Sequence, residues 1–337
     1  MIGRSLGWMI AILLLAMAAW GVWHTWGAAR PPVDAIVVRA LLREESKPYT
    51  ATACLTMPEA GKKIKSTVSL IHSPEAEIVT CPCPGNGTAW TIKKPECSYT
   101  YIPGSGVMVI SRYSSLLTTA QRGRRLLANY RAEYEGTARV AGRKAYAIDL
   151  VPRHGTSPGK RLWIDVQNET VLRSVDRSST GSERGMEITS INYGAPMDRA
   201  AFTPHPKAGT KTIIGCRPAS LAELSRKVGV TVTEPRYVPS GYAIEGRHLF
   251  TPACGCCPSS AQITYTDGLN TISIFENRAG SECKSGCCGP ESDKSGRCRV
   301  ACCGVTGSGR ITRGNKKVVV VADLPASEIR KIAESVE

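Results

Sequence analysis

The sequence is poor in phenylalanine and histidine, and it lacks the common motifs of catalysis. Only three of its 337 residues are Phe and five are His, and the histidines are scattered along the chain. No nucleophile elbow, HExxH pattern or P-loop is present. No His has a Ser, Cys or carboxylate partner at a recognisable spacing. We therefore expect a protein that is not an enzyme and that needs no cofactor.

Two acidic residues beside aromatic or glycine residues are explained as turn residues. Asp165 closes Trp163-Ile164-Asp165, and Asp267 precedes Gly268. Aspartate in such places accepts hydrogen bonds from the backbone of the next residues. We expect both carboxylates to shape turns rather than to catalyse a reaction.

Long apolar runs are absent except for one near the N-terminus, from Leu6 to Trp26. A membrane-spanning helix needs about 20 such residues. Arg4 precedes the run, so the positive-inside rule places residues 31–337 outside the cytoplasm. We predict a signal anchor in residues 1–30, which makes a single-pass cell-membrane protein whose bulk is periplasmic. The alternative is a signal peptide cleaved after Ala18, which releases the chain into the periplasm.

The charge is strongly positive, at +15. In an exported protein such a charge favours an anionic membrane surface or an acidic partner over nucleic acid. General solubility is an equally simple explanation, because charge alone does not name a partner.

Two domains are expected beyond the apolar run, because about 300 residues exceed the usual size of one domain. The first, 31–207, contains an amphipathic helix at 34–46 and a longer helix at 112–131. Elsewhere apolar and polar residues alternate, which is typical of strands. The predicted strands are 48–56, 66–72, 76–82, 88–93, 98–103, 133–140, 143–151, 160–166, 169–178 and 185–194.

Hairpin turns are predicted at Gly104-Ser105-Gly106, Ala141-Gly142 and Gln167-Asn168. Successive antiparallel hairpins with few helices favour a curved sheet or an open barrel. The second domain, 208–337, has a helix at 220–228, strands at 241–249, 261–266, 270–276 and 316–322, and a final helix from Ser327. A Cys-rich insert occupies 278–309, and the domain is small and α+β in class.

The chain resembles a known family in both domains. The first domain, with Trp163-Ile164-Asp165, Val171-Leu172-Arg173, Glu187-Ile188 and Phe202, resembles a LolA-type lipoprotein-carrier domain. The second resembles the C-terminal domain of the MucB/RseB sigma-E regulators. The segments that carry this second likeness are Tyr237-Val-Pro-Ser-Gly-Tyr242, Tyr265-Thr-Asp-Gly-Leu269, Ile272-Ser-Ile-Phe275 and Val-Val-Ala-Asp-Leu-Pro325. The predicted fold class is therefore α+β: an N-terminal transmembrane helix, a LolA-like curved antiparallel half-barrel with covering helices, and a small α+β domain.

The resemblance implies a binding protein of the cell envelope. Its expected partner is the extracytoplasmic domain of an anti-sigma factor or another membrane protein, and an acyl-chain lipid or lipoprotein is a second expected partner. The apolar stripe of the helix at 112–131 is the candidate lining of a ligand pocket, although ordinary core packing is the commoner explanation for any one residue of such a stripe. The candidate residues are Leu116, Leu117, Ala120, Leu126, Leu127, Tyr130 and Trp163.

Fourteen cysteines are many for this length, and export to an oxidising compartment makes disulfides the expected state. The insert has few apolar residues, so crosslinks would compensate for its missing core. An all-Cys metal site is the alternative, as is a redox pair at Cys81-Pro82-Cys83. The disulfide candidates are Cys54, Cys81, Cys83, Cys97, Cys216, Cys254, Cys256, Cys257, Cys283, Cys287, Cys288, Cys298, Cys302 and Cys303.

Three functional hypotheses follow from the sequence. The first is an envelope-stress regulator that binds an anti-sigma factor and senses lipid or lipoprotein. The second is a membrane-tethered carrier of lipoprotein or other acylated cargo. The third is a redox or metal-binding envelope protein that uses the cysteines.

Overall fold

The computed structural model describes residues 31–42, 47–59, 62–83, 87–155, 157–177, 183–253, 257–280 and 307–337. Residues Asp34–Glu337 belong to one compact unit. The helices of the described residues are α2 (Val33–Leu42), α3 (Thr119–Asn129), α4 (Leu221–Val228) and α5 (Ala326–Glu334), with 3-10 turns η1 (Pro103–Ser105) and η2 (Arg199–Phe202).

The strands of the N-terminal half are β1 (Tyr49–Glu59), β2 (Lys62–His72), β3 (Glu77–Cys83), β4 (Gly87–Lys93), β5 (Cys97–Ile102), β6 (Val107–Arg112), β7 (Tyr130–Val140), β8 (Arg143–Pro152), β9 (Gly159–Asp165), β10 (Val171–Arg177) and β11 (Glu183–Asn192). Those of the C-terminal half are β12 (Lys211–Pro218), β13 (Ala243–Phe250), β14 (Ser260–Thr266), β15 (Thr271–Arg278), β16 (Gly307–Arg313) and β17 (Lys316–Ala322).

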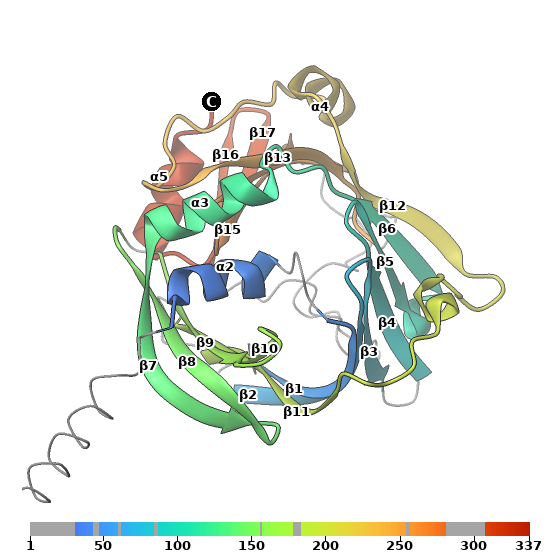
Figure 1. Cartoon of the computed structure of the whole chain (residues 1–337). Helices are drawn as coiled ribbons and strands as arrows, with labels where there is room; N and C mark the ends of the chain where they lie inside the picture. The colour runs from blue at the N-terminus through green and yellow to red at the C-terminus, as the bar shows by residue number, and fades with distance from the viewer. Residues whose placement is uncertain are drawn as a thin grey trace, which may run out of the picture. The chain divides into compact units, whose positions relative to one another are not determined.

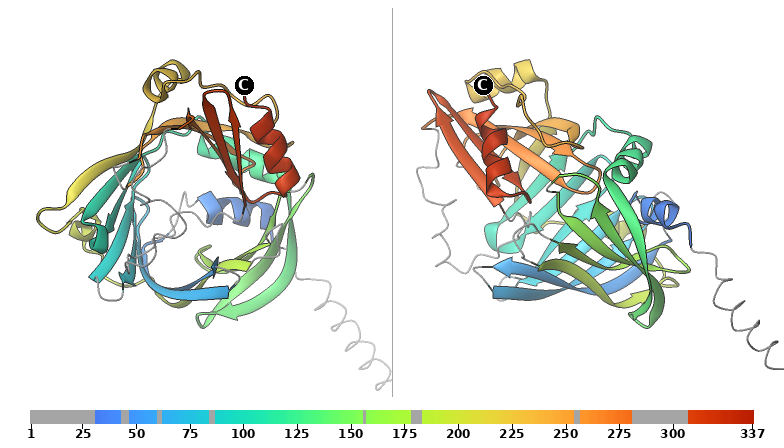
Figure 2. Two further views of the ribbon diagram at one scale, coloured as in Figure 1. Left: turned by 180° about the vertical axis from the view of Figure 1, so that it is seen from behind. Right: turned by 90° about the vertical axis from the view of Figure 1, so that its left-hand side faces the viewer.

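All of these strands are hydrogen-bonded into one sheet of 17 strands. Strands β7 to β11 follow one another, β11 pairs with β1, and β1 to β6 continue the sheet. Strand β6 pairs with β12, and β13, β14, β15, β17 and β16 follow. Every pairing is antiparallel except that of β6 with β12, which is parallel. Figures 1 and 2 show the sheet curving strongly, with α2 and α3 together at one open end.

Most predicted elements of the first half are confirmed. The strands β1–β5 and β7–β11 lie where the alternation predicts them, and η1 with Gly106 in the left-handed region makes the predicted turn after β5. The helix predicted at 112–131 is shorter than expected, because Thr118 and Gln121 form a capping box that starts α3 at Thr119. Strand β6 occupies the residues before that cap.

Buried apolar side chains gather on both faces of the sheet. Leu70 belongs to a cluster with Ala51, Ala53 and Leu172, whereas Ile71 packs against a second cluster. Successive residues of a strand point to opposite faces, so these clusters lie on opposite sides of β2. The second cluster is closed by Phe202 of η2. A further cluster, drawn only from residues 219–336, joins β13–β17 to α4 and α5.

The predicted fold class is corrected in two respects. The half-barrel and the C-terminal strands are not separate sheets, because β12 hydrogen-bonds along β6 and makes the sheet continuous and mixed. None of the helices in the described ranges is both long and apolar enough to cross a bilayer. The segment Leu6 to Trp26 lies outside those ranges, so the predicted transmembrane helix is no part of the fold described here. The boundary predicted at 207/208 stays a prediction.

Candidate functional site

The residues predicted to line a ligand pocket do not form one surface. Leu116 and Leu117 precede α3, and Leu116 is 52% exposed. Ala120 is exposed on the first turn of the helix. Leu126 and Tyr130 are buried, whereas Leu127 is half-buried. The stripe is therefore divided between an exposed N-terminal part and a buried C-terminal part.

Trp163 lies apart from this stripe, on β9. Its side chain is half-buried and packs beside the cluster that contains Ala51 and Leu172. The guanidinium of Arg173 lies over its ring, 4.4 Å from the ring centroid. Its part in ligand binding, like that of the other candidates, stays a prediction.

The buried C-terminal end of α3 packs against two turns. One lies before β13, at Gly241, and the other lies after β14, at Asp267 and Gly268. The Asn129 amide donates to the carbonyl oxygens of Gly241 (3.0 Å) and Asp267 (2.8 Å). A Cβ at Gly268 would stand 2.5 Å from the backbone nitrogen of Leu126, so helix and turn are in direct backbone contact. We call these contacts the α3 junction.

Tyr130 completes the α3 junction. Its hydroxyl donates to Asp267 Oδ2 at 2.5 Å and accepts from the Asn270 amide at 2.7 Å. Burial, with the nearby Asp267 carboxylate, raises the pKa of Tyr130 far above its ordinary value, so the hydroxyl keeps its proton. The Asp267 carboxylate also accepts from the backbone of Leu269 and Asn270, which confirms its predicted role in a turn.

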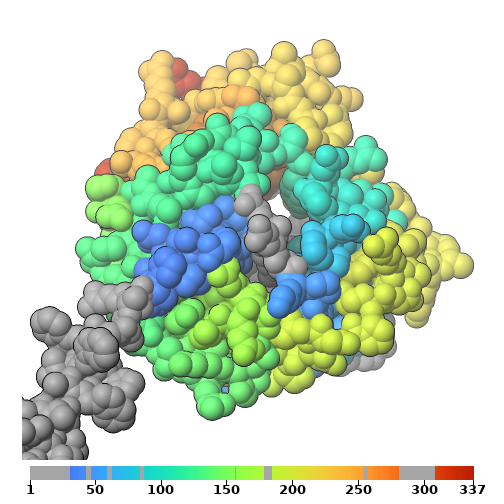
Figure 3. All heavy atoms as spheres, viewed as in Figure 1, coloured from blue at the N-terminus to red at the C-terminus, as the bar shows by residue number. Residues whose placement is uncertain are grey.

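A small pocket of about 150 Å³ opens beside α2, and we call it the α2 pocket. Helix α2 is packed on α3 at this end, because a Cβ at Gly123 would lie 3.2 Å from both Val38 and Leu42. Figure 3 shows α2 on the surface between α3 and the segment that joins β9 to β10. The lining residues are Arg39, Ala40, Lys47, Tyr49, His72, Gln167, Asn168, Glu169, Thr170 and Val171.

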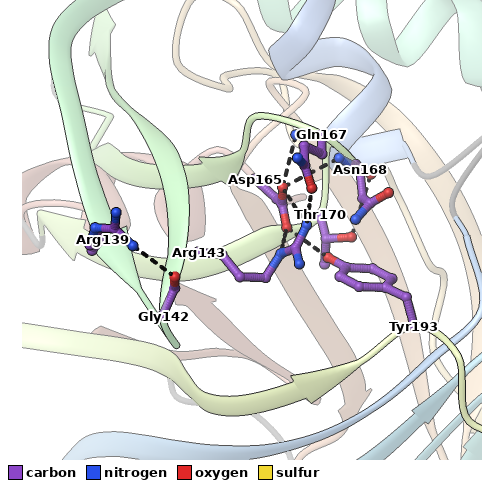
Figure 4. A network of polar contacts seen from close by, with 8 residues as sticks. All are labelled: Arg139, Gly142, Arg143, Asp165, Gln167, Asn168, Thr170 and Tyr193. Carbon is purple, nitrogen blue, oxygen red and sulfur yellow. Dashed lines mark hydrogen bonds and ion pairs between the residues drawn. The ribbon is translucent and has the colours of Figure 1, made fainter.

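The β9–β10 turn that forms one wall of the α2 pocket is built around Asp165 (Figure 4), which is 1% exposed. Its carboxylate accepts from Arg143, from the Tyr193 hydroxyl at 3.1 Å and from the Gln167 backbone at 2.8 Å. Burial by itself raises the pKa of Asp165, but these hydrogen bonds and the Arg143 charge outweigh it and hold the pKa below its ordinary value. The carboxylate is therefore ionised, as its predicted turn role requires.

Glu169 in the same turn pairs with α2. Its two carboxylate oxygens accept from Arg39 Nε and Nη2, both at 2.6 Å. Glu169 has φ +52°, and among the described residues only Ala141 is another non-glycine residue with positive φ. A non-glycine residue in this region costs about 1–2 kcal/mol, so the surrounding turn must hold it there.

The α2 pocket was not predicted from the sequence. Its wall at 167–171 was identified only as a turn, and Arg39 lies 130 positions from Glu169. The sequence signal for this pocket was the acidic turn residue Asp165. It indicates where the turn at 167–171 lies, but not that Arg39 of α2 lies opposite this turn.

Most cysteines of the described residues are thiols, whereas the sequence predicted disulfides. Cys54, Cys81, Cys97 and Cys216 are free thiols, so the predicted bridges are absent there, and Cys257 is also a thiol. Cys83 is disulfide-bonded. Burial raises the pKa of the Cys216 thiol to about 11. The candidates outside the described residues are Cys254, Cys256, Cys283, Cys287, Cys288, Cys298, Cys302 and Cys303.

Metal binding finds no support in the described part of the chain. No three or more His, Cys, Asp or Glu side chains within it come together as metal ligands would.

Comparison with known proteins finds one matching family model and several structures of the same fold. Residues 100–205, which include α3 and the β9–β10 turn, match the family model of the MucB/RseB N-terminal domain. The fold matches the crystal structure of MucB with a TM-score of 0.57 over 92% of this chain and 98% of that chain, at 18% identity. The chain is therefore similar to the MucB/RseB proteins in this domain and shares the fold of MucB.

Two further matches are to proteins of the same kind. MucB in the Pseudomonas aeruginosa MucA/MucB complex has a TM-score of 0.57, at 16% identity, over 90% of this chain and 98% of that one. The sigma-E factor regulatory protein RseB of Escherichia coli K12 is 22% identical over 235 residues. That alignment covers 69% of this chain and 66% of RseB, slightly less than two thirds of the relative.

Proposed function

We propose that this chain is a non-enzymatic, extracytoplasmic regulator that binds the extracytoplasmic part of an anti-sigma factor. The observation that carries the proposal is the match to MucB, which has also been solved in complex with MucA(peri), over 90% of this chain. The fold that holds a partner in that complex is thus present almost in full.

An exposed apolar segment just before the N-terminal end of α3 is the surface that we assign to this partner. Five large apolar side chains are exposed among the described residues, and Tyr113 and Leu116 are the most exposed, at 51% and 52%. Both belong to the linker between β6 and α3. The Leu116 backbone donates to Glu245 at 2.7 Å, and the Tyr113 ring meets His248 edge-on, so the linker is held on β13. Apolar side chains fixed on a firm support are typical centres of protein interfaces.

The test is a binding titration of the full chain with the extracytoplasmic part of a membrane-bound anti-sigma factor of its host. The double variant Tyr113→Ser, Leu116→Ser is expected to bind about tenfold or more weakly, a loss of about 1.4 kcal/mol or more. Ile64→Ser, at another exposed apolar residue, is the matched control and should bind like the parent. Absence of binding by the parent would reject the regulator function. Equal binding by parent and double variant would reject only the assigned surface.

Lipid or lipoprotein sensing is the finer part of the proposal, and the C-terminal strands support it. Ile274 of β15 points into the cluster under α4 and α5, so its neighbour Phe275 points to the opposite face. There Phe275 meets Phe250 edge-on, at 5.4 Å between ring centroids, and stands opposite Val319. All three side chains are half-buried. Mass spectrometry of lipid that co-purifies with the chain tests this, and Phe275→Ser should retain less of it.

A further inference from the structure

The α2 pocket has the wrong size and lining for an acyl chain. Cavities for drug-sized apolar ligands usually hold about 300–1,000 Å³ and have mostly apolar walls. The α2 pocket holds about 150 Å³, and most of its lining residues are polar or charged. A small polar group fits this space better than a hydrocarbon.

The charges at the pocket favour an anion. Arg39 and Lys47 contribute two positive charges, and Glu169 is the one acidic residue of the lining. Lys47 is exposed and makes no ion pair with any residue that the structure describes. The side-chain amides of Gln167 and Asn168 lie around the same space and supply neutral hydrogen-bond donors, whereas the Thr170 hydroxyl donates to the Asn168 carbonyl oxygen.

The pair between Arg39 and Glu169 occupies the position that an anionic ligand would take. Its two hydrogen bonds have the bidentate geometry that arginine forms with carboxylate and phosphate groups alike. The side chains are 41% and 34% exposed, and an ion pair so open to water contributes only about 0–1 kcal/mol. Replacement of the Glu169 carboxylate on Arg39 by the oxyanion of a ligand therefore costs little free energy.

The wall of the pocket is also fixed before any ligand arrives. Asp165 holds the Gln167 backbone, and the Glu169 backbone donates to the Asp165 carbonyl at 3.0 Å. Glu169 is thereby kept in the left-handed region, at φ +52°. Strain of this kind, at a residue that faces a pocket, is typical of binding sites.

We propose that the α2 pocket binds a compact oxyanion, a carboxylate or phosphate group, which takes Arg39 from Glu169 and contacts Lys47. This site goes beyond the proposed function, since it requires neither the anti-sigma factor nor the exposed linker. Glu169 acts in it as an internal competitor for Arg39.

The test is calorimetric titration of the full chain with sodium phosphate and, separately, with sodium acetate, at constant ionic strength against chloride. Lys47→Gln should weaken binding about fivefold to tenfold, because it removes one charge-assisted contact. Glu169→Gln should tighten binding severalfold, because it removes the competitor. Lys65→Gln, at an exposed lysine on β2, is the matched control and should leave the affinity unchanged.

The two anions distinguish the ligand chemistry. Stronger binding of phosphate assigns a phosphate group to the pocket, and stronger binding of acetate assigns a carboxylate. The proposal is overturned if neither anion binds more strongly than chloride. It is also overturned if Glu169→Gln weakens binding, or if Lys47→Gln and Lys65→Gln behave alike.

Discussion

Asp165 shows at the scale of a single residue how a buried charge shapes the α2 pocket. Its carboxylate has ionic or hydrogen-bonded partners on β8, in the β9–β10 turn and at Tyr193. The ionised form is favoured by Arg143, whose guanidinium also lies 4.8 Å from the centroid of the Tyr193 ring. One residue thus connects three parts of the chain that are distant in sequence.

Asp165→Ala is expected to lower the free energy of unfolding by about 3–5 kcal/mol at pH 7, because it leaves Arg143 without its buried partner. The pKa of Asp165 is lower in the folded than in the unfolded chain, where it is about 3.9. The stabilisation is therefore present above about pH 4 and is lost as the pH falls toward the folded-state pKa. Urea unfolding measures this at pH 7 and below pH 4. The difference in free energy of unfolding between parent and variant should be smaller at the lower pH.

Asp176→Ala provides the matched control for Asp165. Asp176 pairs with Lys160 at 2.7 Å, and the two side chains are 30% and 23% exposed. Removal of such a pair should cost less than about 1 kcal/mol. Equal losses in the two variants would contradict the role given to Asp165.

At the scale of elements, α3 is positioned by its cap at one end and by a glycine turn at the other. Thr118 and Gln121 cap each other's backbone at 3.2 and 2.8 Å and start the helix. Gly268, at φ +98°, brings the turn between β14 and β15 against the Leu126 backbone. The sequence shows the cap and the turn separately, but not that the turn contacts the helix that the cap begins.

Gly268→Ala should be markedly destabilising in thermal or urea unfolding. A side chain there is strained by its backbone angle, by about 1–2 kcal/mol, and it also meets the backbone of α3, which adds about 1–3 kcal/mol. Gly209→Ala is the control, because Gly209 has φ +79° with no atom within 4 Å of a Cβ. If the two variants lose equal stability, the close contact of Gly268 with α3 is not important.

At the scale of the whole unit, the α3 junction and the β6–β12 pairing connect the curved N-terminal strands to the C-terminal strands. The apolar clusters on either side draw on separate parts of the chain. The junction is polar by contrast, with Asn129 and Tyr130 facing Asp267 and Asn270. We therefore expect its hydrogen bonds, together with the β6–β12 pairing, to couple the unfolding of the two parts.

Tyr130→Phe tests this connection. The Asp267 carboxylate loses a buried donor, which should cost about 1–3 kcal/mol. Hydrogen exchange should accelerate in α3 and at residues 266–270 but not in β1 and β2. Tyr134→Phe is the control, since Tyr134 lies on the same strand and stacks edge-on with Tyr146. A uniform acceleration over the whole unit would argue against a local junction.

The sequence by itself determined the order and type of most elements. The alternation of β1–β5 and β7–β11 and the turn roles of Asp165 and Asp267 are all local features. Side-chain period and backbone hydrogen bonds within a few residues specify them, so one stretch of chain suffices to predict them.

Only the tertiary structure decided which distant groups meet. The parallel pairing of β6 with β12 joined two predicted sheets, and the same fold separated Leu116 from Tyr130 by burial. It also brought Arg39 to Glu169 across 130 positions and so formed the α2 pocket. Such contacts depend on how the sheet curves and on which edges pair, and neither property is contained in the period of any single strand or helix.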